Sequence, residues 1–299
     1  GIRALVGDTD GRRSAITSTS DLSAEAVDRM AQDAVALARA TAVDPAAGLP
    51  EGGFAEDWAE LDLGLVAPED RGVGIDARIA DAQVAEAASR GRDPRITNSE
   101  GSQVGSDFRH VVYGNSLGFV GEYDTSSHSL FAEPIARDAE GAMQRDYWMT
   151  VGRRLAELEA PASVGERAAD RALRRLGART LPTCEVPVIF DALTAPSLLQ
   201  QLAGCVSGYA VYRQSTFLAE RLGDTIASSL VTAIDDGRRH GGLGTRPFDG
   251  EGLATRRNTV LDAGRLETFL LDSYSARKLG LASTGNAQRS AGSAHDRRR

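Results

Sequence analysis

The stretch Asp191–Tyr212 reads DALTAPSLLQQLAGCVSGYAVY and predicts a helix at the centre of the second half of the chain. Pro196 suits a first helical turn, and Gly204 and Gly208 are residues at which helices end. The apolar residues recur at the spacing of one helical face, typical of a helix buried against a core; they are Ala195, Leu198, Leu199, Leu202, Ala203 and Val206. We therefore expect this helix to lie inside a domain.

Composition describes an ordinary globular protein rather than one that binds nucleic acid or a membrane. The 299 residues suffice for two domains, and 41% hydrophobic with 25% charged residues is a common balance for a core and a polar surface. The formal net charge of −8 opposes contact with phosphates. Because the sequence shows neither an 18-residue apolar run nor a signal peptide, we expect a cytoplasmic protein with Cys184 and Cys205 as free thiols.

The first half of the chain predicts an α+β domain, residues 1–142. The turn-forming words SEG, GNS and DTSS divide its later part into short strands, which favours an antiparallel meander packed by two helices. In the second helix, Ile75 and Ile79 are expected to face inward. The expected elements are strands Ile2–Val6 and Arg13–Thr19, helices Ser23–Ala42 and Glu69–Ser89, and strands Ile96–Ser99, Gln103–Tyr113, Leu117–Tyr123 and Ser129–Ile135.

The second half predicts a β-rich domain, residues 163–287, built around the quoted helix. Residues 143–162 are expected to form an interdomain passage, and residues 288–299, which lack apolar periodicity, a disordered tail. The expected elements are helix Val164–Leu176, strands Cys184–Phe190 and Ala227–Ile234, hairpin Val260–Leu271 with its turn at Asp262–Gly264, and a short helix capped by Ser273 that ends at Gly280.

The sequence displays no catalytic site of its own. Its four histidines are scattered, and neither a G-x-S-x-G elbow nor a phosphate loop is present. A Ser–His–Asp set assembled in space stays open at this stage. Asp249 and Glu251 favour a turn over an acid–base pair. Tyr147 and Trp148 form either a packed anchor or a substrate groove.

Five stretches carry a resemblance that covers most of the chain: MQRDYW at Met143–Trp148, RALRRLGAR at Arg171–Arg179, PTCEVPVIFD at Pro182–Asp191, FDGEG at Phe248–Gly252 and LLDSYSARKLGLASTGNA at Leu270–Ala287. The chain resembles the TldD/PmbA family, in its PmbA (TldE) branch. Members of that family have further N-terminal sequence and continue after Ala287 with apolar strands. The resemblance therefore implies a chain truncated at both ends.

The resemblance also bears on metal chemistry. In the TldD branch the helix that corresponds to the quoted one carries an HExxxH zinc motif, whose positions in this chain are Gln200, Gln201 and Cys205. Neutral amides are poor zinc ligands and cannot act as a general base, and a single thiolate is not a site. The resemblance thus implies no metal, cofactor or catalytic residue in this chain, with zinc in a TldD-like partner.

Three interpretations of function follow. The first is a metal-free subunit of a TldD/TldE-type heterodimeric zinc metalloprotease that acts on unfolded or leader peptides in the cytoplasm. The second is a peptide-binding scaffold without proteolysis, which holds peptides by strand pairing. The third is a truncated product without function. None of them involves nucleic acid or a membrane.

Overall fold

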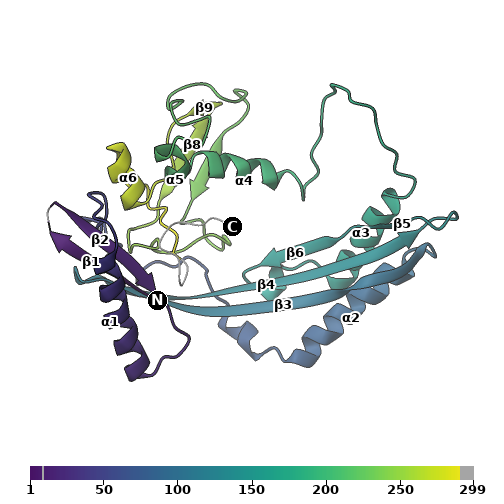
Figure 1. The fold of residues 1–299 in the computed structure, drawn as a ribbon. Coiled ribbons are helices and arrows are strands. Elements are labelled where there is room, and N and C mark those ends of the chain that lie inside the picture. Colours follow the sequence, from purple (N-terminus) through teal and green to yellow (C-terminus); the bar gives the residue numbers. More distant parts are fainter. Residues whose placement is uncertain (9, 290–299) are drawn as a thin grey trace.

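The computed structural model describes residues 1–8 and 10–289, and confirms a mixed α+β architecture. At the N-terminus, β1 (Ile2–Asp8) pairs antiparallel with β2 (Gly11–Thr17), and α1 (Ala24–Ala40) packs on both strands (Figure 1). The Ser23 side chain accepts a hydrogen bond from the Ala26 amide and caps the helix, as predicted.

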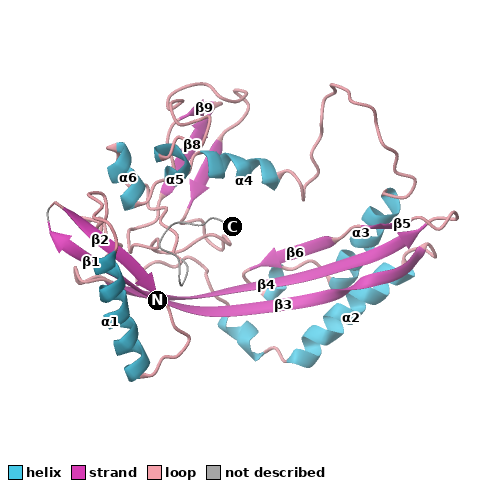
Figure 2. Ribbon diagram, in the orientation of Figure 1, coloured by secondary structure: helices cyan, strands magenta, loops and turns pink. Residues whose placement is uncertain are grey.

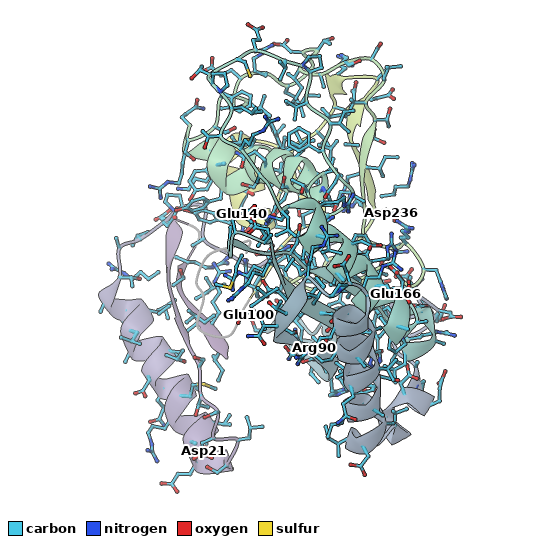
Figure 3. The ribbon with its side chains drawn as sticks, turned by 90° about the vertical axis from the view of Figure 1, so that its right-hand side faces the viewer. Asp21, Arg90, Glu100, Glu140, Glu166 and Asp236 are labelled. Atoms are coloured by element: carbon cyan, nitrogen blue, oxygen red, sulfur yellow. The ribbon has the colours of Figure 1, made fainter. Side chains whose placement is uncertain are left out.

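The centre of the molecule is one very long hairpin. Strands β3 (Ile96–Gly114) and β4 (Val120–Arg137) pair antiparallel along nearly their whole length, and the short strands β5 (Met143–Arg145) and β6 (Trp148–Gly152) pair with β4. Helices α2 (Ile75–Gly91) and α3 (Pro161–Arg174) lie side by side on one face of this sheet (Figure 2). In Figure 3, Arg90 of α2 and Glu166 of α3 mark these two neighbours.

The four short strands predicted here are thus wrong, because only GNS makes a turn. The SEG stretch lies within β3 and causes only a shift of the pairing register between Ser99 and Ser102, where Gly101 adopts a φ of +114°. The DTSS stretch continues as strand because residues 107–110 face it and form the ladder with it. Long-range pairing overrides the turn propensity of the polar residues.

The face of α2 that meets the sheet is not the predicted one. Ile75 and Ile79 are exposed, Ile75 by 67%, whereas Ala85 and Ser89 are fully buried. Helix α3 approaches so closely that a Cβ added at Gly165 lies 2.1 Å from the Ala85 carbonyl oxygen. Such close packing accepts only small side chains, so the two isoleucines lie on the outer face.

The segment predicted as an interdomain passage belongs to the hairpin layer. Met143–Arg145 and Trp148–Gly152 are strands β5 and β6, and the 3₁₀ helix Leu155–Glu157 then leads into α3. Helix α3, which we expected in the second domain, packs on β4 and α2. The first layer therefore runs to the end of α3, since the apolar face of that helix needs this sheet.

The C-terminal unit is a small sheet with three helices. Its elements are α4 (Pro196–Cys205), α5 (Gly208–Tyr212), β7 (Ala233–Asp236), β8 (Arg257–Asp262), β9 (Arg265–Leu266) and α6 (Ser273–Leu279). Ala263 and Gly264, both with positive φ, make the predicted hairpin turn. Asp272, rather than Ser273, caps α6, and Gly280 ends it in the left-handed conformation.

Two predictions are wrong, one about the connection between α3 and α4 and one about the burial of α4 itself. Cys184–Phe190 is not a strand but part of an exposed connection that projects from the molecule (Figure 1), with Ile189 96% exposed. Helix α4 itself buries no residue completely, and Leu199 is 58% exposed. Periodicity identified the helix, but it does not say what covers the apolar face.

The N-terminal part closes on the C-terminal unit through contacts between residues far apart in sequence. The Ala55 amide donates to the Gly252 carbonyl, and Asp44 accepts from both Tyr274 and Lys278. Next to these contacts lies an aromatic cluster to which three parts of the chain contribute; its members are Phe54, Ala55, Trp58, Tyr113, Phe119, Tyr123, Phe248 and Ala254. No helix in the part of the chain that the structure describes is long and apolar enough to cross a membrane.

Candidate functional site: a cavity between the hairpin and the C-terminal unit

A cavity of about 970 Å³ lies between the long hairpin and the C-terminal unit. Its floor is one face of β3 and β4, because the lining residues are direct cross-strand pairs of one side: Asp107 with Ser127, Arg109 with Thr125, and Val111 with Tyr123. The alternate residues of β4, such as Ser126, His128 and Leu130, are buried, and of these three only Ser126 also lines the cavity. The two faces of the hairpin therefore do different work, one building a core and the other a cavity floor.

The apolar face of α4 forms another wall of this cavity. Leu199, Leu202 and Ala203 line it, together with Val206 directly after the helix. Leu202 and Val206 also pack against the core of the C-terminal unit, whereas Leu199 is largely exposed. Of the residues predicted to be buried, Val206 is buried as expected, whereas Leu199 faces an open space large enough for several side chains of a ligand.

Arg153, directly after β6, joins the two sides of the cavity. Its buried guanidinium donates to the Ser126 carbonyl on the hairpin and to the Gly242 and Leu243 carbonyls of the C-terminal unit, at 2.7 to 3.0 Å. Burial lowers the pKa of Arg153, an effect that Tyr123 and Glu157 oppose. A single cation thus satisfies carbonyls of both units and holds the cavity walls together.

The three positions that match the zinc motif do not form a metal site. Gln200 and Gln201 are exposed, the Gln201 amide nitrogen lies 3.7 Å from the Cys205 sulfur, and none of the three lines the cavity. Within residues 1–8 and 10–289, no three His, Cys, Asp or Glu side chains gather closely enough to hold a metal ion. The residues present therefore do not fit zinc.

Tyr147 and Trp148 are packed against neighbouring side chains. The Tyr147 ring lies 5.4 Å from the Phe131 ring, and the Trp148 indole nitrogen donates to Glu159 at 3.0 Å while Arg167 lies over its ring. Neither residue lines the cavity. These contacts are those of an anchor for β6 and α3, and a substrate groove at Tyr147 and Trp148 stays a prediction.

The structure brings together one Ser–His–Asp set that no sequence spacing indicated. The Ser106 hydroxyl lies 2.8 Å from His128 Nδ1, and Asp70 Oδ2 lies 3.4 Å from His128 Nε2. Ser106 and His128 are a cross-strand pair, and Asp70 also accepts from the Leu155 amide. His128 is buried, Ser106 is half-buried and none of the three lines the cavity, so the set lies apart from the space in which a ligand would be held.

The pair Asp249 and Glu251 forms a buried turn, as predicted. Asp249 accepts hydrogen bonds from the amides of Glu251, Leu253 and Ala287, and burial raises its pKa to about 6. Glu251 accepts from the Ser273 amide and pairs with Arg289. These carboxylates hold the start of α6 and the segment after it in place.

Arg289 is also a correction to the predicted tail. Its guanidinium pairs with Glu251 and Asp272, so Gln288 and Arg289 belong to the packed C-terminal unit. The remainder of that prediction, residues 290–299, lies outside the described residues.

Two family models match this chain. The PmbA/TldA metallopeptidase central domain matches residues 68–176 and the PmbA/TldA metallopeptidase C-terminal domain residues 183–298. The chain belongs to the PmbA/TldD family. Its central domain thus holds the hairpin layer with α2 and α3, and its C-terminal domain holds α4 to α6.

Curated relatives agree with this assignment. The chain is 41% identical to metalloprotease PmbA of Escherichia coli O157:H7 over 92% of its length and 60% of that protein, and 35% identical to a PmbA homologue of Haemophilus influenzae over 96% and 62%. A TldD homologue of Haemophilus influenzae is 29% identical over only 42% of the chain and 26% of that protein. The chain spans about 60% of the length of the PmbA relatives it matches.

Solved structures share the fold. BT3649 of Bacteroides thetaiotaomicron, described as a candidate modulator of DNA gyrase, superposes with a TM-score of 0.86 at 26% identity, over 96% of this chain and 64% of the other. TldE of Thermococcus kodakarensis superposes with a TM-score of 0.78 at 23% identity, over 97% and 65%, which shows the fold alone.

Proposed function

We propose that this chain is the metal-free subunit of a TldD/TldE-type heterodimeric metalloprotease. The observation that carries the proposal is the chemistry of α4: the helix lines the large cavity, but the zinc-motif positions hold Gln200, Gln201 and Cys205. Membership of a metallopeptidase family together with this side-chain set supports the proposal that a TldD-like partner supplies zinc and the general base.

In this proposal the chain forms one wall of the peptide channel. The cavity combines an apolar wall from α4 with a polar floor from the hairpin, and its volume accommodates an extended segment of several residues. Unfolded and leader peptides present such segments, and we propose them as the substrates. The pair would act in the cytoplasm.

The test mixes this chain with a purified TldD-like subunit and follows cleavage of an unstructured peptide, with and without a chelator. We expect cleavage only in the mixture, loss of cleavage with chelator, and no stoichiometric zinc on this chain by elemental analysis. Chelator-sensitive cleavage by this chain alone, or one tightly bound zinc per chain, overturns the assignment of roles.

A peptide-binding scaffold without proteolysis is the second candidate, favoured by a cavity whose described lining contains no histidine, glutamate or cysteine. It makes a different prediction in the same assay. The chain then binds the peptide but neither associates with the TldD-like subunit nor supports cleavage.

A further inference from the structure

The cavity is positively charged in an acidic protein. Four arginines and two aspartates are the charged residues that line it, whereas the whole chain carries a formal net charge of −8. The lining residues concerned are Arg109, Arg153, Arg246, Arg256, Asp107 and Asp235. A concave surface with such an excess attracts anions more strongly than the flat surface around it.

Two of the four arginines already have full partners. Arg109 pairs with the neighbouring Asp107, and Arg153 is saturated by the carbonyl groups that it joins. Asp235 accepts from the amides of Asn258 and Asn286, so it neutralises neither of the remaining arginines.

Arg246 and Arg256 lack an acidic partner among the described residues. Arg246 is half-buried, and one of its nitrogens donates to the Ala287 carbonyl at 3.2 Å, which leaves further N–H groups of its fork for a ligand. No ion pair to a described carboxylate is formed by either residue, although the adjacent Arg257 pairs with Asp236. Arg256 is exposed and Arg246 half-buried, so both guanidinium groups are open to a ligand in the cavity and can bind a carboxylate through charge-assisted hydrogen bonds.

Tyr123 adds a neutral donor to the same wall. Its ring packs edge-on against Phe248 at 5.2 Å, which fixes its position. Burial raises the pKa of Tyr123, an effect opposed by the positive charges of Arg246 and Arg153, so both cations lie close enough to act on it. At neutral pH the hydroxyl keeps its proton, and it makes no hydrogen bond to any described residue.

We propose that Arg246, Arg256 and Tyr123 form a carboxylate-binding subsite in the cavity, which recognises an acidic residue or the terminal carboxylate of an extended peptide. This subsite deepens the proposed function and rests on it for the nature of the ligand. An arginine fork binds a carboxylate with two parallel hydrogen bonds, and a phenol supplies a third donor. The apolar wall of α4 stands in the same cavity, so apolar residues next to the acid fit as well.

The test measures binding rather than cleavage, by fluorescence anisotropy with three labelled peptides of one unstructured sequence. The first has a central Glu and a C-terminal amide, the second a central Gln and a free C-terminus, and the third a central Gln and a C-terminal amide. We expect the third to bind at least ten times more weakly than the better of the other two, and the difference to shrink as salt rises. Equal binding of all three peptides overturns the proposal. Tighter binding of the first peptide identifies an acidic side chain as the ligand, and tighter binding of the second identifies the terminal carboxylate.

Variants then locate the subsite. Arg246→Gln, Arg256→Gln and Tyr123→Phe should each reduce the preference for the carboxylate at least threefold, with Arg257→Gln as the matched control that leaves it unchanged. A thermal melt accompanies every variant, and Tyr123→Phe, which removes one oxygen, serves as the test if an arginine variant fails to fold. A loss as large in Arg257→Gln as in Arg256→Gln shows attraction by overall charge and overturns the subsite.

Failure of the subsite and failure of the proposed function give different results. A carboxylate preference that depends on Arg246, combined with no cleavage in a mixture with the TldD-like subunit, removes the protease role and supports the subsite. Cleavage of all three peptides at equal rates with equal binding supports the protease role and overturns the subsite.

Discussion

Helices α3 and α4 look alike in sequence and differ completely in their surroundings. Both begin with a proline and carry an apolar face. Helix α3 buries Val164, Gly165, Ala168, Ala169 and Ala172 between α2 and the sheet, whereas α4 buries none of its residues and presents its apolar face to a cavity. Small residues on a helix face indicate contact with backbone, and leucines on a helix face indicate only that something apolar can be accommodated.

The largest expected effect comes from placing a charged side chain on the apolar face of α3, compared with the same change on the apolar face of α4. Val164→Asp places an unpaired carboxylate in the closed layer and should destabilise the protein by about 4 kcal/mol or more. Leu199→Asp, at a side chain that is 58% exposed, should change the free energy of unfolding by less than about 1 kcal/mol. Urea denaturation of both variants measures the difference. Equal destabilisation would mean that the face of α4 is covered in solution.

The next comparison uses one glycine in each helix. Gly165→Ala brings a methyl group within 2.1 Å of the Ala85 carbonyl oxygen, so the helices must separate, at a cost of about 3 kcal/mol. Gly204→Ala meets nothing within 4 Å and should stabilise α4 by up to about 1 kcal/mol, because alanine loses less backbone entropy. Melting temperatures should therefore move in opposite directions. A stable Gly165→Ala protein would show that the α2–α3 contact adapts.

A smaller expected effect is an opposite pH dependence of stability from the hairpin layer and from the C-terminal unit. Each contains a buried group whose neutral form is favoured by burial: burial lowers the pKa of His128, partly opposed by Asp70, and raises that of Asp249 to about 6. For Asp249 the unfolded chain releases its proton near pH 4 and the folded chain near pH 6, so its contribution is complete below about pH 4 and is lost as the pH rises to 6. For His128 the unfolded chain takes up a proton first, so its contribution is complete above about pH 6.5 and is lost as the pH falls.

Unfolding free energies at pH 4.5 and 6.5 for His128→Gln and Asp249→Asn test these signs. The advantage of the unchanged protein over Asp249→Asn should grow by about 2 kcal/mol on going to the lower pH, part of the roughly 3 kcal/mol that a pKa near 4 and one of about 6 imply. Its advantage over His128→Gln should shrink over the same interval. A change of the same sign in both variants would contradict the assigned pKa directions.

Local chemistry made much of the fold predictable. The Ser23 cap, the glycine after α6 and the turn at Ala263 and Gly264 act over a few residues, and all three were found where expected. The long hairpin was not predictable, because polar stretches such as DTSS stay extended only when the preceding strand continues beside them and pairs with them. The strand predicted through Ile189 was wrong because no strand lies beside this segment, and β-branched residues form a strand only where a partner pairs with them.

The site followed the same rule. Sequence reasoning located the α4 positions that matter for zinc, because a motif is a local pattern. It missed Arg153, Tyr123 and Arg246, which lie far apart in sequence and share a cavity only after the hairpin and the C-terminal unit meet. A single arginine in a sequence is not part of any motif that marks it as functional. Only the fold shows whether acidic residues lie near it in space.

The contacts of Ala55 with Gly252 and of Asp44 with Tyr274 and Lys278 also have a consequence in time. A ribosome that adds 5–20 residues per second needs roughly 10–50 s to pass from the first partner of each pair to the second. Throughout that interval Phe54 and Trp58 have no Phe248 to pack against. Phe54 can stack on Phe119 earlier in synthesis, but the cluster is complete only after Phe248 has been made.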